Sequence, residues 1–366
     1  MKKIGIVTIC DYNNYGNRLQ NYALQEILKQ YNCNVKTIQN DFKLNQAYKK
    51  KKVFLIRIKF ILKYIKKTFI VKKTERLKFF LKFNKYINIT KSVFNLMGNN
   101  NLSRYNYIIV GSDQVWNPNF GRLTEFDLLD FTDNKNKISF SASFGIDSLP
   151  EDYKKTTEYA LKKFKKISVR EDAGKKIIKD LTGRTDIEVL VDPTMLLSAK
   201  EWDEVAKRPK QLNKDKYILN YFLGEMSEKR KQEIEKIAKE NDCEIINILD
   251  KNSPFYQTGP SEFLYLEKNA FLICTDSFHS CVFAIIYNRP FVVFDREDNT
   301  VSMNSRIETL LNKFMLQDRK YNGKLTEEQL KHNYENAYKI LEKEKQKAYD
   351  FLNTALDIKE NEIERK

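Results

Sequence analysis

Histidine is scarce in this 366-residue sequence, which contains only His279 and His332. None of the five cysteines forms a CxxC pair, and there is no HExxH motif, so zinc chemistry has little support. No His/Cys/Ser triad can be assembled from these residues. An odd number of scattered cysteines is typical of reduced, mostly buried thiols in a cytosolic protein.

Other signatures are missing as well. GxxxxGK[ST] and GxGxxG are absent and no Asp-x-Asp pair follows a predicted strand, so P-loop and simple dinucleotide-binding chemistry are poorly supported. No window reaches about 18 uninterrupted apolar residues, so we expect no transmembrane helix. Residues 1–10 are a β-type run rather than a signal peptide. These absences predict a cytoplasmic protein.

The charge that is present is concentrated in one segment. The chain has a net charge of +16, and residues 49–85 contain fifteen Lys or Arg and a single acid, so they carry +14 of it. A basic insert in an otherwise near-neutral protein indicates one local surface rather than a nucleic-acid-binding protein. Hydrophobic residues make up 42% of the chain and aromatic residues 13%, which is enough to fill real cores.

The basic segment has opposed faces when drawn as a helix. Apolar side chains gather on one side and lysines on the other, which predicts an amphipathic helical insert at about residues 43–90. Such a helix can rest on the inner face of the cytoplasmic membrane, or its apolar face can pack on the N-terminal sheet or a second subunit. Cations and aromatics are segregated rather than interleaved, so we expect no nucleic-acid partner. The apolar side comprises Phe54, Ile58, Ile61, Ile65 and Phe69, and the basic side Lys52, Lys59, Lys63 and Lys66.

Around this insert, strand and helix patterns alternate, which predicts an α/β fold with parallel sheets. We expect an N-terminal Rossmann-like domain at 1–196, a second at 197–322, and a helical segment at 323–366 that packs back on the first domain. Ligands of such sheets bind at the carboxyl ends of the strands. The expected strands lie at 3–9, 34–39, 105–110, 137–141, 167–169 and 187–191, then at 217–223, 244–249, 271–275 and 291–294, with a long helix or helix pair at 326–362.

Three residues are candidates for acid catalysis or anion binding. His279 lies just after the strand at 271–275, at a predicted helix start that also contains Ser277 and Ser280. It is either a general acid or anion ligand, or simply a satisfied histidine at a capped helix. Arg170, after the strand at 167–169, and Arg306 are either anion clamps or ion-paired side chains.

Two further loops are candidates for substrate binding. The turn containing Asn14, Gly16 and Asn17 precedes a helix and can approach a phosphate. The loop after the strand at 105–110 is dense in polar and turn residues, and its tryptophan either stacks on a sugar or packs internally. The candidates in this loop are Gly111, Ser112, Asp113, Gln114 and Trp116.

These pieces, in their order along the chain, resemble the polysaccharide pyruvyl transferase family. Each motif is weak alone, but the ordered set is fairly specific and covers about residues 4–310. The motifs are NYG at 14–16, LQNYALQ at 19–25, VGSDQVWN at 110–117, SVRE at 168–171, VDPT at 191–194, GPSEF at 259–263, TDSFHS at 275–280 and NRP at 288–290.

The resemblance implies a two-domain fold like the GT-B glycosyltransferases, with the active cleft between the domains. It also implies transfer of pyruvate from phosphoenolpyruvate onto two hydroxyls of a sugar, as a ketal, without a metal or organic cofactor. Arg170 matches the family's catalytic arginine and His279 its catalytic histidine. Ser277 stands where better-studied members have arginine, so either Arg306 replaces that cation or the donor differs.

The implied acceptor is a lipid-linked oligosaccharide or polysaccharide precursor of a capsule or exopolysaccharide. Two other functions stay open on the sequence alone. One is a glycosyltransferase of the same architecture that uses a nucleotide sugar. The other is a basic binding module without enzymatic activity.

Overall fold

The computed structural model describes residues 1–38, 75–90, 104–297 and 304–358. The predicted amphipathic helix with its apolar face at residues 54–69 lies outside these ranges. The chain divides into two compact units, one of residues 1–193 with 350–366 and one of residues 194–349. We describe each unit by itself.

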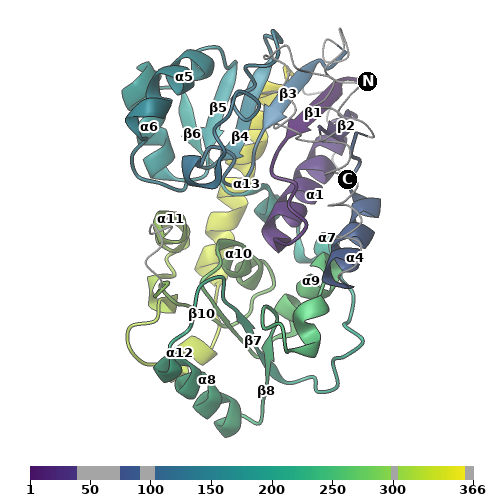
Figure 1. The fold of residues 1–366 in the computed structure, drawn as a ribbon, viewed down its shortest axis with the longest axis vertical. Coiled ribbons are helices and arrows are strands. Elements are labelled where there is room, and N and C mark those ends of the chain that lie inside the picture. The colour runs from purple at the N-terminus through teal and green to yellow at the C-terminus, as the bar shows by residue number, and fades with distance from the viewer. Residues whose placement is uncertain (39–74, 91–103, 298–303, 359–366) are drawn as a thin grey trace, which may run out of the picture. The chain divides into compact units, whose positions relative to one another are not determined.

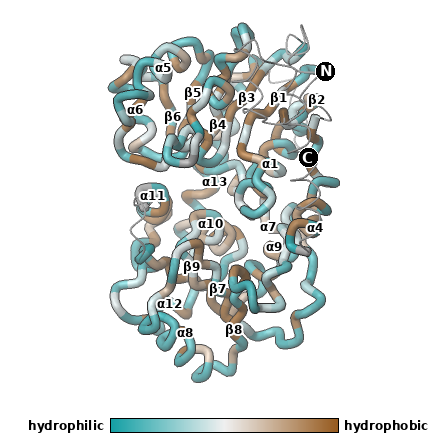
Figure 2. The backbone as a smooth tube through the Cα atoms, in the orientation of Figure 1, coloured by the Kyte–Doolittle hydropathy of each residue, from teal (hydrophilic) through white to brown (hydrophobic). Residues whose placement is uncertain are grey.

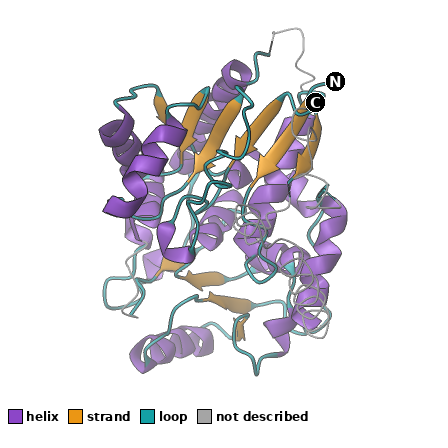
Figure 3. Cartoon of the chain, turned by 45° about the horizontal axis from the view of Figure 1, so that its top comes forward, coloured by secondary structure: helices purple, strands orange, loops and turns teal. Residues whose placement is uncertain are grey.

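The first unit is built on a six-stranded sheet in the order β2-β1-β3-β4-β5-β6, and the strand pairs are all parallel (Figures 1 and 3). Short apolar runs such as YIIV and KISFSA are buried along their whole length, as expected for a parallel sheet covered on both faces. The strands are β1 (Lys3–Val7), β2 (Asn34–Thr37), β3 (Tyr107–Val110), β4 (Lys137–Ala142), β5 (Lys166–Val169) and β6 (Ile187–Val189).

Helices connect these strands. α1 (Tyr15–Lys29) begins at the N-cap Asn14, whose side chain accepts a hydrogen bond from the Asn17 N–H at 3.2 Å. α6 (Asp172–Thr182) ends at Gly183, whose φ of 73° suits glycine at this position. α5 (Glu151–Leu161) and α6 pack against each other, and α6 contacts β5 and β6 (Figure 1). α4 (Glu75–Lys82) and the 3₁₀ turn η1 (Phe83–Tyr86) are the described part of the predicted basic insert.

The second unit has a four-stranded parallel sheet in the order β10-β9-β7-β8. Its strands are strongly apolar, whereas α8 is hydrophilic along most of its length (Figure 2). The strands are β7 (Tyr217–Tyr221), β8 (Glu244–Asn247), β9 (Leu272–Thr275) and β10 (Phe291–Val293). The principal helices are α7 (Ala199–Asp203), α8 (Glu228–Glu240), α9 (Pro260–Asn269), α10 (Phe278–Ile286) and α11 (Asn304–Phe314).

The C-terminal part contains a short helix, α12 (Glu327–Leu330), and a long one, α13 (Glu335–Ala355). Residues from 350 onward belong to the first unit. There Phe351 packs against Phe140 of β4, with ring centroids 6.1 Å apart, and the Tyr107 hydroxyl donates to the Leu356 carbonyl at 2.8 Å. Two parallel α/β sheets and a long C-terminal helix confirm the predicted fold class.

Among the described residues, no helix is both long enough and apolar enough to cross a membrane.

Candidate functional site

Both sheets reverse their strand order once, and several of the predicted site residues follow the strands at that point. In the first unit the reversal falls between β1 and β3, and in the second between β7 and β9. Successive connections leave in opposite directions there, and ligands of open α/β sheets bind outside the carboxyl ends of the strands at such a point. Each unit therefore has one place where ligand-binding loops are expected.

In the first unit, side chains join the two central loops. The Thr8 hydroxyl, after β1, donates to the Ser112 carbonyl, after β3, at 3.3 Å. The Asn17 amide, in the first turn of α1, donates to the Asp113 carboxylate. The structure thus brings together two segments that the sequence singled out separately.

The backbone of the β3 loop has a conformation that requires glycine. Gly111 has a φ of +124°, and a Cβ there would lie 2.2 Å from the Phe140 carbonyl oxygen. The Gly111–Ser112 peptide is cis, and Asp113 has a φ of 64°. The Ser112 N–H donates to Gln20 Oε1 at 3.1 Å. This turn places the Ser112 hydroxyl and the Asp113 carboxylate side by side at the end of the sheet.

Arg170 lies between two carboxylates in this loop cluster. Its Nη1 donates to Asp192 Oδ2 at 2.8 Å and its Nη2 to Asp113 Oδ1 at 3.1 Å, and the side chain is 2% exposed. The Ser112 hydroxyl also donates to Asp192, at 2.5 Å. Burial alone would lower the pKa of Arg170, but the charges of Asp113, Asp192 and Glu171 outweigh it and raise the pKa.

This geometry shows ion pairs of the kind that the sequence allowed for Arg170: its guanidinium binds two carboxylates of its own unit. Glu171, the next residue, is fully buried and accepts from the Ser143 hydroxyl at 3.0 Å and from the Phe144 and Gly145 N–H groups at 2.8 and 3.1 Å. Arg170 and Glu171 together fix the loops after β3, β4 and β6.

The remaining candidates of the first unit differ in accessibility. Asn14 is half-buried at the N-cap of α1, and Gly16 is buried in the first turn. Gln114 lies against Gly145, where an added Cβ would be 2.1 Å from its amide nitrogen. Trp116 is fully buried, donates to the Asp127 carbonyl at 2.9 Å, and packs on Phe144. The substrate-binding prediction for Trp116 is therefore corrected: its ring fills the core and presents no face to a sugar.

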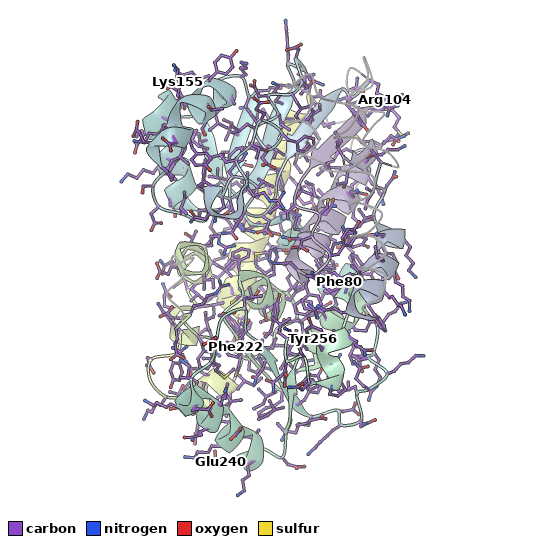
Figure 4. All side chains as sticks on the ribbon, viewed as in Figure 1. Phe80, Arg104, Lys155, Phe222, Glu240 and Tyr256 are labelled. Carbon is purple, nitrogen blue, oxygen red and sulfur yellow. The ribbon has the colours of Figure 1, made fainter. Side chains whose placement is uncertain are left out.

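In the second unit, Asp276 joins the two central loops. It directly precedes Ser277, the N-cap residue of α10, whose own side chain makes no capping hydrogen bond. The Asp276 carboxylate accepts from the Leu223 and Gly224 N–H groups, after β7, at 2.7 and 2.8 Å. It also pairs with Arg296 Nε at 3.2 Å. Phe222, labelled in Figure 4, belongs to the same β7 loop and packs on Phe294.

His279 lies in the first turn of α10 and is 6% exposed. Its ring makes an edge contact with that of Phe278, with centroids 5.4 Å apart. The Ser277 N–H donates to the Thr275 hydroxyl at 3.0 Å. The Ser280 hydroxyl donates to Glu267 of α9 at 2.5 Å, so this candidate residue binds a neighbouring helix. Burial raises the pKa of Glu267 well above its ordinary value, and the Ser280 bond opposes that shift only in part.

Arg306 lies near the first turn of α10, which carries the histidine motif. It is 7% exposed, and its guanidinium carbon is 5.9 Å from the centroid of the Phe278 ring. α11, which carries it, packs on α10. Residues 277–280 and 306, far apart in sequence, are thus brought together in the second unit.

Sequence reasoning missed several charged residues near the central loops. Arg76, from the basic insert, is 4% exposed, donates to the Tyr15 hydroxyl at 2.8 Å, and lies over the rings of Tyr15 and Phe80. Arg18 is fully buried, and Arg296 pairs with Asp276. None stands in a recognisable motif, and their partners are distant in sequence, so composition and spacing gave no signal for them.

Each α/β unit thus has charged side chains in the loops that follow its central strands. The sequence matches the family described as polysaccharide pyruvyl transferase over residues 14–299, which is most of the chain. The chain belongs to this family and is therefore a transferase. No curated protein matches it.

Solved structures with a similar chain path include a glycosyltransferase from Rickettsia africae ESF-5, at 11% identity and a TM-score of 0.47, covering 97% of this chain and 98% of that one. A UDP-GlcNAc 2-epimerase from Neisseria meningitidis, bound to UDP-GlcNAc, is also 11% identical with a TM-score of 0.47, covering 96% and 100%. The UDP-GlcNAc 2-epimerase of Methanocaldococcus jannaschii is 15% identical with a TM-score of 0.43, covering 93% and 99%.

Proposed function

We propose that the protein transfers pyruvate from phosphoenolpyruvate to a sugar of a surface-polysaccharide precursor, forming a cyclic ketal. The observation that carries this proposal is the family match over residues 14–299, together with the buried His279 in the first turn of α10, where Arg306 lies over the adjacent Phe278 ring. The precursor is of the capsular or exopolysaccharide type and is carried on a lipid.

The reaction sets clear demands on the site. A proton must be added to the methylene carbon of phosphoenolpyruvate, which makes its central carbon electrophilic. One sugar hydroxyl bonds to that carbon and loses its proton, and the bond to the phosphate oxygen breaks to release inorganic phosphate. A second hydroxyl then bonds to the same carbon and loses its proton, which closes the ketal. The donor brings a carboxylate and a phosphate, so the site needs cations and N–H donors.

The second unit can supply the acid and a cation. We assign His279 as the group that protonates the methylene carbon, because a positioned imidazole is the usual general acid near neutral pH. Arg306 binds an anionic group of the donor, assisted by the N–H groups of the first turn of α10. Ser277 occupies the place of the family's second arginine, and Arg306 and Arg296 are cations near this turn.

In the first unit, Arg170 acts as a positioning residue in this proposal. It holds the Asp113 and Asp192 carboxylates at the ends of β3 and β6, at 3.1 and 2.8 Å. A carboxylate at this point can accept the proton that a sugar hydroxyl loses. Arg170 then supports the acceptor side of the reaction instead of binding the donor.

Donor binding tests the proposal. Calorimetric titration should show binding of phosphoenolpyruvate and no binding of nucleotide sugars. Arg306→Gln should weaken the affinity for phosphoenolpyruvate at least about tenfold, because a charge-assisted contact is worth about 1.5–3 kcal/mol. Arg319→Gln is the matched control, because Arg319 is equally buried at 7% exposed and also lies over an aromatic ring, that of Tyr334. Binding of a nucleotide sugar but not of phosphoenolpyruvate would instead favour the glycosyltransferase.

A further inference from the structure

Arg18 is a buried cation that the proposed reaction does not use. It lies in the first turn of α1 and is 0% exposed. Its Nη2 donates to Asn84 Oδ1, and its guanidinium carbon lies 5.0 Å from the centre of the Tyr12 ring. Its Nε and Nη1 have no hydrogen-bond partner among the described residues.

The charge of Arg18 is not neutralised by an ion pair. Within the described ranges no carboxylate forms a salt bridge with it, whereas Arg170 in the same unit has two. Burial lowers the pKa of Arg18, and the nearby Cys10, Tyr12 and the exposed Asp11 oppose that shift only in part; a guanidinium stays charged at neutral pH. A buried charge without an ion-pair partner is costly, and a bound ligand of opposite charge offsets that cost.

The loop after β1 lies near Arg18, and the charge of Arg122 also acts on the Cys10 thiol of this loop. Burial raises the pKa of the nearby Cys10 thiol, and the charges of Arg18 and Arg122 both oppose that rise. Cys10, Tyr12 and Arg122 are half-buried, and Asp11 and Asn13 are exposed. The Tyr12 ring thus covers one side of the guanidinium, in the loop that follows β1.

We infer that Arg18 and the loop of residues 10–14 form an anion-binding subsite in the first unit, which takes a phosphate or diphosphate group of the acceptor, with Arg122 adding positive charge nearby. A buried guanidinium with two unbonded nitrogens, in the first turn of a 15-residue helix, suits a phosphate dianion. Only the assignment to the acceptor rests on the proposed function, in which Arg306 of the second unit serves the donor. A sugar joined to its carrier through phosphate offers this anion.

The Cys10 thiol is a reporter for occupancy of the subsite. Iodoacetamide labelling of Cys10 is followed by mass spectrometry with and without inorganic pyrophosphate, and the half-buried Cys243 of the second unit is the internal control. At pyrophosphate about ten times its dissociation constant, mass action leaves about a tenth of the sites open, so labelling of Cys10 falls by up to about tenfold. Labelling of Cys243 stays unchanged.

Arginine variants distinguish specific binding of pyrophosphate at this subsite from a non-specific effect of pyrophosphate on thiol labelling. The ratio of labelling rates with and without pyrophosphate is compared within each variant, since the charge of Arg18 also affects the thiol itself. Arg18→Gln should abolish protection, and Arg122→Gln, at a half-buried and more tolerant position, should weaken it. Arg184→Gln, which removes a half-buried arginine paired with Asp186, should keep it.

The labelling needs no turnover, so its outcome is independent of whether phosphoenolpyruvate is the donor. Absence of protection in the wild-type protein at millimolar pyrophosphate overturns the subsite, as does full protection in both the Arg18 and Arg122 variants. Phosphoenolpyruvate should protect less than pyrophosphate at equal concentration. Equal or better protection by phosphoenolpyruvate would assign the subsite to the donor and overturn its assignment to the acceptor.

Discussion

His279 and His332 differ in burial, so the turnover of their variants can be compared to test the role of His279. His279 is buried in the first turn of α10, whereas His332 is exposed between α12 and α13. We predict that His279→Gln lowers turnover at least about 100-fold, the usual scale for a positioned general acid, with the fold intact. His332→Gln should leave turnover unchanged. Near-normal turnover of a folded His279 variant removes this residue from the mechanism.

Glu267 makes the stability of the second unit depend on pH. Because burial raises its pKa well above 4.5, the folded chain keeps a proton that the unfolded chain loses. The folded state then binds more protons, so this contribution to stability falls as pH rises above the ordinary carboxyl pKa. Glu267→Gln mimics the protonated acid and does not titrate.

Thermal unfolding of the Glu267→Gln variant should therefore show a midpoint advantage over the wild type that grows from pH 5 to pH 8. Glu240→Gln, at an exposed position of α8, should show no such growth. A constant difference between the Glu267 variant and the wild type across this range would mean that Glu267 is ionised in the folded protein.

Residue roles could be predicted from the sequence only in part. The strand-end positions of Arg170 and His279 were evident from local pattern. The partners of Arg170 were not, because Asp113 and Asp192 are 57 and 22 residues away and meet it only through the sheet order. The burial of Trp116 likewise depends on Phe144 and Phe164, which come from other segments.

At the scale of elements, the β3 loop depends on the backbone of Gly111. We predict that Gly111→Ala lowers the free energy of unfolding by about 3 kcal/mol or more, because it combines an unfavourable φ with a clash against the Phe140 carbonyl. Gly121→Ala is the control, since Gly121 also has a positive φ, of +63°, but nothing lies within 4 Å of its added Cβ. That variant should cost about 1 kcal/mol.

Urea unfolding measures both glycine variants. Equal losses would show that the backbone conformation, and not the close approach to β4, makes glycine necessary at position 111.

Strands such as β3 and β9 could be predicted because each is a short, mostly apolar run. β3, β7 and β9 were placed within two residues at either end, since parallel strands covered on both faces have little besides apolar residues. α5 and α9 were not predicted. In α5 only Thr157, Ala160 and Leu161 are buried, which is too short a stripe to give a clear helical period.

At the scale of the whole molecule, the basic segment of residues 49–85 carries most of the net charge. We predict that it attaches the protein to the inner face of the cytoplasmic membrane, since anionic lipid attracts each nearby cation by about 1 kcal/mol. The protein should co-sediment with anionic but not neutral vesicles. Changing Lys52, Lys59, Lys63 and Lys66 to Glu should abolish binding, and absence of wild-type binding at low salt contradicts the prediction.

The most direct measurement of the central claim follows the pyruvyl carbons themselves. The protein is incubated with ¹³C-labelled phosphoenolpyruvate and a panel of lipid-linked glycosyl diphosphates that differ in their terminal sugar. The products are analysed by mass spectrometry. We predict that one acceptor gains a labelled ketal with release of an equal amount of inorganic phosphate, and that His279→Gln does not form it. Transfer of a sugar from a nucleotide donor to these acceptors, with phosphoenolpyruvate left intact, would contradict the account.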